Sequence, residues 1–448
     1  MDPIFTEGQE GLEKALQPPT DPKHQPMALP TEVPDPRRAR PGPRARRIQV
    51  IDALRGFALL GILPMNMISF ANPDWILFNP TVHGSFEGVE KWLWVVSHVL
   101  ADQKFMTIFS PLYGAGILLF TTNLENKGMR PTGVFLRRSL WLLAFGLLHY
   151  GLLWDGDILM LYALSGMAVY WLRNRSAVFL AMAGLAMIAV HAVLILGAGL
   201  AMPFMPESEA AALYADYAPS ADAINADIAL RREPYPTQVR HRLAAAPEEA
   251  VILILAWGFW RAAGLMLIGM AAWKLRLFTA ERSDRTYMGM ATIGLLAGLP
   301  LVSFGVWDRI RMGWDAAHAF YGGGYQYNYW ASILVSAGYI GVVMLAERRD
   351  WLPGLRRRLA AVGRMAFTNY IMHTVICVAI FQGFGGGLYG TTSRLEQTVF
   401  VLGVWMLQII LSPWWMDRFR YGPLEWLWRS LTYGRMEPFR RSPAGAHG

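Results

Sequence analysis

The group in this sequence best suited to acid–base chemistry is a histidine with two carboxylates close behind it. His149 stands near the end of the third apolar run, in the sequence GLLHYGLLWDGDILML, and Asp155 and Asp157 follow within eight residues. A carboxylate can orient an imidazole ring and stabilise its charged form, so His149 can act as a general base. We expect Trp154 and Asp155 to contact a substrate. The simpler interpretation is that His149 bonds a backbone carbonyl and that Asp157 caps the next helix.

A second polar group lies along the first apolar segment, IDALRGFALLGILPMNMISF. Arg55 and Asn66 are 11 residues apart, which is nearly three full helical turns, so both lie on one face about 16 Å apart. Asp52 lies one turn below Arg55 on nearly the same face. Pro64 frees a backbone carbonyl and favours a lined cavity. The alternative is that Asp52 pairs with Arg55 at the membrane surface while Asn66 bonds a neighbouring helix.

Four further polar residues stand inside or beside apolar segments, where an ionisable group costs about 2.5–3.5 kcal/mol. Lys104, Arg261, Asn369 and His373 could each line a polar cavity. We expect Arg261 and Asn369 to contact a substrate. Lys104 could equally extend to the membrane interface, and a lone histidine such as His373 is more often a structural hydrogen-bonding group.

Two other signals do not predict a site. The nine histidines show no HExxH or other metal-binding spacing, so no metal is expected. Gly385, Gly387 and Gly390 fit GxGxxG but follow an apolar segment instead of a strand, which excludes a dinucleotide-binding βαβ unit.

The elements that position these residues are apolar helices. Of 448 residues, 54% are hydrophobic and 17% charged, whereas a soluble chain carries about 25% charged residues. We therefore predict an all-α, polytopic integral membrane protein with about ten transmembrane helices, each near the length of about 20 residues that a span requires. The predicted spans are 51–71, 91–121, 135–154, 157–173, 176–202, 250–273, 286–306, 327–346, 364–384 and 397–416.

The charges in the connections predict the orientation. Lys and Arg gather in alternate connections and in the C-terminal tail, and the positive-inside rule then places both termini in the cytoplasm. Residues 1–47 are predicted to be a disordered basic cytoplasmic tail, and 48–434 a transmembrane domain. Residues 203–249 form an extracytoplasmic loop expected to cover the outer mouth of the site, and 435–448 form a cytoplasmic tail. Because the net charge of +8 is divided among short clusters, no nucleic-acid partner is expected.

Four motifs in order resemble the YeiB-like family of bacterial inner-membrane proteins, also called domain of unknown function 418. They read IDALRGFALLGILPMN, LLHYGLLWDGDIL, GRMAFTNYIMHTVIC and GPLEWLWRSLT, and the resemblance covers most of 48–434. It implies a multi-pass protein of the bacterial cytoplasmic (inner) membrane.

A more distant similarity is to transmembrane acyltransferases such as heparan-α-glucosaminide N-acetyltransferase. In that family an Asn follows the Arg of the first helix after ten residues, as Asn66 follows Arg55 here. The family pairs this Asn with a catalytic His in the next loop, where this sequence offers only His83. His149 lies inside a stronger motif and is the better candidate.

The leading hypothesis is a membrane-bound acyltransferase that moves an acetyl group from acetyl-CoA to a small-molecule, glycan or lipid acceptor at the outer side. His149 would be the general base, Asp157 or Asp155 would orient it, and Asn66 would bond the developing oxyanion. Arg55 and Lys104 would bind the CoA cofactor. The alternatives are a transporter that uses the same polar residues as a path, and a scaffold or lipid-binding protein. Membrane lipids and a homodimer are expected partners.

Overall fold

The computed structural model describes residues 43–251 and 258–441, and these ranges contain helices but no β-strand. Two short 3-10 helices, η1 (Asp74–Leu77) and η2 (Met202–Phe204), accompany the α-helices. The α-helices are α2 (Pro43–Ala71), α3 (Gly88–Leu100), α4 (Lys104–Glu125), α5 (Pro131–Leu152), α6 (Leu159–Tyr170), α7 (Ala177–Ala201), α8 (Glu207–Tyr217), α9 (Ala221–Arg232), α10 (Tyr235–Val251), α11 (Phe259–Lys274), α12 (Asp284–Arg311), α13 (Ala316–Ala319), α14 (Gly323–Arg348), α15 (Pro353–Arg364), α16 (Ala366–Phe381), α17 (Arg394–Arg418) and α18 (Pro423–Tyr433).

The chain is an all-helical protein with several helices that can cross a membrane, as predicted. Six helical segments are long and apolar enough, and α15 with α16 add a seventh if this pair, bent by 81°, counts as one span. The six segments are Gln49–Ala71, Gly88–Glu125, Ala177–Phe204, Asp284–Arg311, Ala316–Arg348 and Arg394–Arg418.

The predicted count of ten spans exceeds these six or seven. A helix occurs within each of the ten predicted runs, but α6 has only 12 residues, or about 18 Å at 1.5 Å per residue. This is less than a hydrocarbon core of about 30 Å. The helix α5 carries two adjacent arginines, and α11 has 16 described residues next to the gap at 252–257. Length and charge therefore leave α5, α6 and the described part of α11 below what a free-standing span requires.

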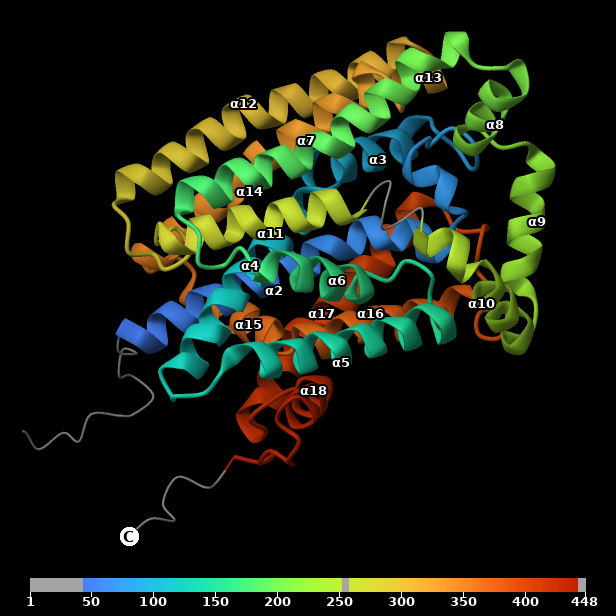
Figure 1. Ribbon diagram of the computed structural model, residues 1–448. Helices are drawn as coiled ribbons and strands as arrows, with labels where there is room; N and C mark the ends of the chain where they lie inside the picture. Colours follow the sequence, from blue (N-terminus) through green and yellow to red (C-terminus); the bar gives the residue numbers. More distant parts are fainter. Residues whose placement is uncertain (1–42, 252–257, 442–448) are drawn as a thin grey trace, which may run out of the picture. The chain divides into compact units, whose positions relative to one another are not determined.

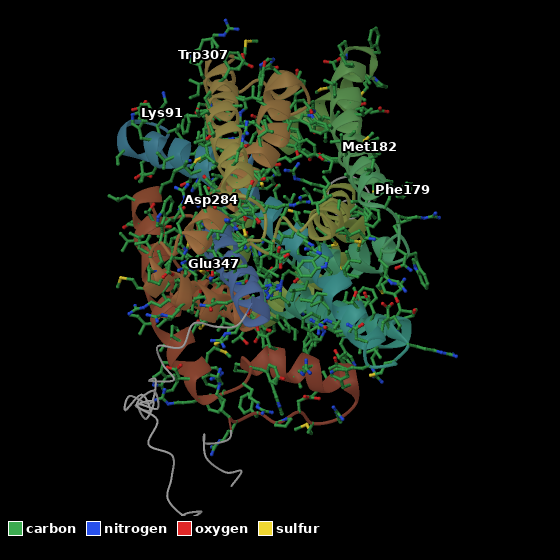
Figure 2. All side chains as sticks on the ribbon, turned by 90° about the vertical axis from the view of Figure 1, so that its left-hand side faces the viewer. Lys91, Phe179, Met182, Asp284, Trp307 and Glu347 are labelled. Atoms are coloured by element: carbon green, nitrogen blue, oxygen red, sulfur yellow. The ribbon has the colours of Figure 1, made fainter. Side chains whose placement is uncertain are left out.

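The long helices differ in how much of their surface they bury. About 61% of the apolar stretch of α2 is buried inside the protein, whereas about 28% of the corresponding stretch is buried in α7 and in α17. Phe179 and Met182 point outward from α7 (Figure 2) and are exposed. Trp307 and Asp284 lie near opposite ends of α12 (Figure 2). The helix α2 is thus central, while α7 and α17 present apolar side chains to lipid.

Close helix contacts at glycine fix the position of α2 against α15. A Cβ atom added to Gly363 would lie 1.9 Å from the carbonyl oxygen of Asp52, and one added to Gly56 would lie 2.0 Å from that of Leu359. Small residues at such crossings allow two membrane helices to approach closely. The contact brings the end of α15, with Arg364, next to the first turns of α2.

Residues 203–249, predicted to be a loop, fold into the helices α8, α9 and most of α10. These helices lie beyond the C-terminal ends of α5 and α7 (Figure 1), and α10 packs against α5. The C-terminal helix α18 also packs against α5, and it contacts α16 as well. Of the predicted N-terminal tail, 1–42 lie outside the described residues, and α2 begins at Pro43.

Candidate functional site

The larger of two internal cavities, here called the acidic cavity, has a volume of about 700 Å³. Its walls come from the C-terminal half of α2, η1, the α3–α4 junction, residues 150–158, α9, α10 and the α12–α14 region. Five carboxylates and three guanidinium groups belong to them: Asp74, Asp102, Asp155, Asp157, Asp227, Arg231, Arg242 and Arg309. Within residues 203–249, the helices α9 and α10 therefore contribute to the wall of this cavity.

The second cavity, here called the arginine cavity, has a volume of about 330 Å³. Its walls contain four arginines from four different elements, Arg55, Arg138, Arg364 and Arg429, and one carboxylate, Glu425. Glu425 accepts hydrogen bonds from the backbone N–H groups at the start of α16, which holds α18 over this cavity. The arginine excess favours an anionic ligand.

The two cavities meet at three residues. The walls of both cavities include Ile62 on α2, Ile158 directly before α6, and Tyr370 on α16. One face of α2 continues along both cavities, since Arg55 and Leu59 line the arginine cavity, while Met65, Asn66 and Ser69 line the acidic cavity. The polar stripe predicted on the first helix is therefore a shared wall. Asp52 pairs with Arg55 at 2.8 Å, as the simpler interpretation also proposed.

The histidine and carboxylate predicted to act together are in contact. His149 Nδ1 lies 2.8 Å from Asp157 Oδ1, and His149 Nε2 lies 2.9 Å from the hydroxyl of Thr374. Asp157 Oδ2 accepts the backbone N–H of Met160 at 2.7 Å, so Asp157 also caps α6. Asp157 belongs to the wall of the acidic cavity, whereas His149 lies behind it and lines neither of the two cavities.

Two of the cationic residues named in the sequence analysis, Lys104 and Arg261, form hydrogen bonds inside the helix bundle. The Lys104 ammonium donates to Asn328 Oδ1 at 2.6 Å and to the carbonyl of His98 at 2.7 Å, and it is fully buried. Arg261 donates to the carbonyl of Tyr329 and to two hydroxyl groups. Neither residue lines either cavity, so Lys104 is not beside Arg55.

Three further polar residues of the sequence analysis also lie away from the two cavities. Asn369 donates to the carbonyl of Val362 and to Ser412, and His373 lies 2.8 Å from Gln408. His83 Nε2 lies 2.9 Å from the carbonyl of Gly390. By contrast, Trp154 and Asp155 line the acidic cavity, and their contact with a substrate stays a prediction.

A carboxylate that the sequence analysis missed stands at the end of the polar stripe. Asp74, on η1, is exposed within the acidic cavity. Desolvation by the surrounding protein is the larger cause, and the negative charge of Asp155 the smaller one, that raise the pKa of Asp74 to about 7. Its position directly after the first span, in the sequence NPDW, was the available signal.

A charge network surrounds Asp74. Arg231 donates to Asp155 at 2.6 Å and lies 3.7 Å from Asp227, which also accepts the hydroxyl of Tyr389. Burial acts to raise the pKa of Asp155, but the charge of Arg231 holds it below its ordinary value. One guanidinium, with a single positive charge, is thus shared by two carboxylates, and Asp74 adds a third carboxylate to this group.

Comparison with known proteins identifies relatives over most of the chain. Residues 272–435 match the family model described as Protein of unknown function (DUF418). The chain is 30% identical over 403 residues to Uncharacterized protein YeiB of Escherichia coli (strain K12), which covers 85% of this chain and 95% of that protein. It is 28% identical over 417 residues to Uncharacterized protein YxaH of Bacillus subtilis (strain 168), covering 88% and 96%. No solved structure matches it. The predicted resemblance is confirmed: the chain belongs to the DUF418 family.

Proposed function

We propose that this protein is a membrane-bound acyltransferase that transfers an acetyl group from cytoplasmic acetyl-CoA to an acceptor at the outer side of the membrane. The observation that carries the proposal is that two cavities with different charged groups adjoin each other and share the wall residues Ile62, Ile158 and Tyr370. A donor in the arginine cavity and an acceptor in the acidic cavity would have their reactive groups at this contact. Binding two reactants in one geometry is itself a large part of catalysis.

The orientation belongs to the same proposal. We place both termini in the cytoplasm of a bacterium, with α5, α6 and α11 completing ten spans of the inner membrane. The arginine cavity then opens toward the cytoplasmic ends of the helices, where Arg138 and Arg364 stand beside the basic connections. The acidic cavity lies toward the outer side, beneath α9 and α10.

The donor site would use the four arginines and the aromatic groups around them. Guanidinium groups bind phosphate oxygens in pairs of hydrogen bonds, and CoA carries several phosphates. Arg138 stacks 3.5 Å from the ring centre of Trp428, which keeps this guanidinium in place at the cavity wall. Lys104, predicted to share this task, is occupied elsewhere.

The chemistry would take place at Asp157 and His149. The acceptor oxygen or nitrogen attacks the thioester carbonyl carbon, the C–S bond breaks, and a proton from the acceptor ends on the CoA sulfur. Asp157 stands at the cavity wall and His149 lies 2.8 Å behind it, so the pair would receive the proton together. Asn66 would donate to the developing oxyanion, a contact worth about 2.7–4 kcal/mol in other enzymes.

The test is acetyl-CoA binding to the full-length, detergent-solubilised protein by calorimetry. We expect micromolar binding that weakens at least about tenfold in Arg55→Ala and Arg364→Ala, because each removes a phosphate partner. Arg357→Ala is the matched control, since Arg357 is exposed on α15 and lines neither cavity. No binding by a folded sample at millimolar acetyl-CoA would refute the acyltransferase.

A second candidate is a transporter, which the shared wall of the two cavities along α2 also favours. The same path would carry a small amphipathic molecule, and the charged groups would relay protons. Such a protein would be indifferent to CoA and would show substrate-dependent proton movement in proteoliposomes.

A further inference from the structure

We propose that the acidic cavity binds an organic amine in its cationic form, with the ammonium group beside Asp74 and the apolar part against Trp75 and Trp154. As a statement about the acceptor class, this inference rests on the proposed function. As a statement about binding, it stands on the cavity alone.

The first argument is the excess of negative charge around Asp74. The guanidinium of Arg231 is shared by Asp155 and Asp227. Arg242 donates to the carbonyls of Gly151 and Leu152. No hydrogen bond from an arginine or lysine to Asp74 occurs in the part of the chain that the structure describes. A cation is the ligand that this arrangement attracts.

The third arginine of the cavity is also engaged elsewhere. Arg309 donates to His98 Nε2 at 2.5 Å, and His98 Nδ1 lies 3.1 Å from Asp102. Each of the three guanidinium groups of the acidic cavity therefore donates to a protein acceptor, although Nε of Arg231 and of Arg309 has no hydrogen-bond partner among the described residues. This distinguishes it from the arginine cavity, where an anion is favoured.

The second argument is a buried hydrogen-bond acceptor without a donor. Gln238 is 2% exposed and belongs to the cavity wall. Its side-chain nitrogen donates to the carbonyls of Arg231 and Glu233, both at 2.8 Å, which fixes the amide orientation. Its Oε1 atom has no partner among the described residues, and the same holds for Oδ1 of Asp155. A buried polar atom left in this state needs a partner, and an ammonium supplies three donors and no acceptor.

The third argument is the aromatic wall. Trp75, Phe78, Trp154 and Phe320 line the cavity. A cation close to an aromatic face is stabilised by the ring quadrupole. The volume of about 700 Å³ is within the usual range of about 300–1,000 Å³ for small-molecule sites. An amine that also carries an apolar group satisfies both the rings and the carboxylate.

The site predicts how binding depends on pH. Burial and the charge of Asp155 raise the pKa of Asp74 to about 7, while an aliphatic ammonium stays charged to a higher pH. Affinity should therefore be constant above pH 7 and fall up to about tenfold per pH unit below it, as Asp74 takes up a proton. His98 and His241 also belong to the cavity wall, and a positive charge on either would act in the same direction by repelling the ammonium.

The test uses three probes of one shape: 2-phenylethylamine, the neutral 2-phenylethanol and the anionic 3-phenylpropionate. Binding to the full-length protein in detergent is followed by the fluorescence of Trp75 and Trp154 or by calorimetry. We expect the amine to bind at least about tenfold more tightly than the alcohol, and the acid least. Equal binding of the amine and the alcohol, or tightest binding of the acid, would overturn the inference, and so would no binding of the amine at 50 mM, a concentration about fiftyfold above a millimolar Kd.

Two variants locate the site. Asp74→Asn should remove the preference for the amine and its dependence on pH, whereas Asp222→Asn, a matched change at an exposed acid of α9 outside the cavity, should leave both unchanged. If Asp74→Asn does not fold, Gln238→Met is tested instead. We expect it to weaken binding of the amine at least about threefold. If a folded Asp74→Asn variant still prefers the amine over the alcohol, the site is refuted. Acetyl-CoA binding is measured in the same samples, so failure of the amine site and failure of the donor site are separate results.

Discussion

The imidazole of His149 contacts the carboxylate of Asp157 at 2.8 Å, and both side chains are at most 1% exposed. The same carboxylate caps α6 through the N–H of Met160. One residue therefore joins the ends of α5 and α6 and places a histidine behind the cavity wall. The structural and the functional interpretations of Asp157 apply together.

Asp157→Ala should destabilise the protein by about 1–3 kcal/mol, because it leaves a buried imidazole and a helix N–H without their acceptor. Asp157→Asn keeps one oxygen, which can still accept the N–H of Met160 and cap α6, and should cost less. Thermal unfolding in detergent, followed by tryptophan fluorescence, compares the two variants. An equal loss in both would show that charge, and not hydrogen bonding, is what the site requires.

His149→Gln should lower acetyl transfer by about 10²–10⁴-fold, the usual contribution of a general base. The change retains hydrogen-bonding groups for Asp157 and Thr374, so the midpoint of thermal unfolding should change little. Turnover is measured from the release of free CoA thiol in proteoliposomes. Full turnover in a folded His149→Gln sample would remove His149 from the mechanism.

Gly363→Ala should destabilise the contact between α2 and α15 by about 1–3 kcal/mol, since the added methyl group meets the carbonyl of Asp52 at 1.9 Å. Gly354→Ala is the matched control on the same helix, because a Cβ atom there meets nothing within 4 Å. Denaturation midpoints of the two variants test the prediction. Weaker acetyl-CoA binding in Gly363→Ala would further show that this contact positions Arg55 and Arg364.

Asp74→Asn should stabilise the protein more at pH 8 than at pH 5. The folded-state pKa of Asp74, about 7, lies above its ordinary value of 3.8 because of burial and the charge of Asp155. The folded protein therefore binds this proton more tightly than the unfolded chain, and the contribution of Asp74 to stability falls as pH rises between these values. We would measure the unfolding midpoint from pH 5 to pH 8 for three proteins: Asp74→Asn, the unchanged protein and the control Asp222→Asn. A constant difference between Asp74→Asn and the unchanged protein would contradict the shifted pKa.

The sequence by itself determined the helices, the family and the main polar residues. Length and apolarity are local properties, so the runs that became α2, α7, α12 and α17 were evident before any folding was considered. The face shared by Arg55 and Asn66 follows from helix geometry alone. The pairing of His149 with Asp157 required only that a short connection return the chain upon itself.

Only the tertiary structure decided which polar residues share a cavity. Arg55, Arg138, Arg364 and Arg429 come from four separated segments, and their convergence depends on contacts such as that between Gly56 and α15. Lys104 is also a basic residue, but it donates to Asn328 and to the carbonyl of His98 inside the bundle. A buried polar group must be satisfied by whatever neighbours the packing provides. Asn328 lies 224 residues from Lys104 in the sequence, beyond the reach of periodicity and spacing.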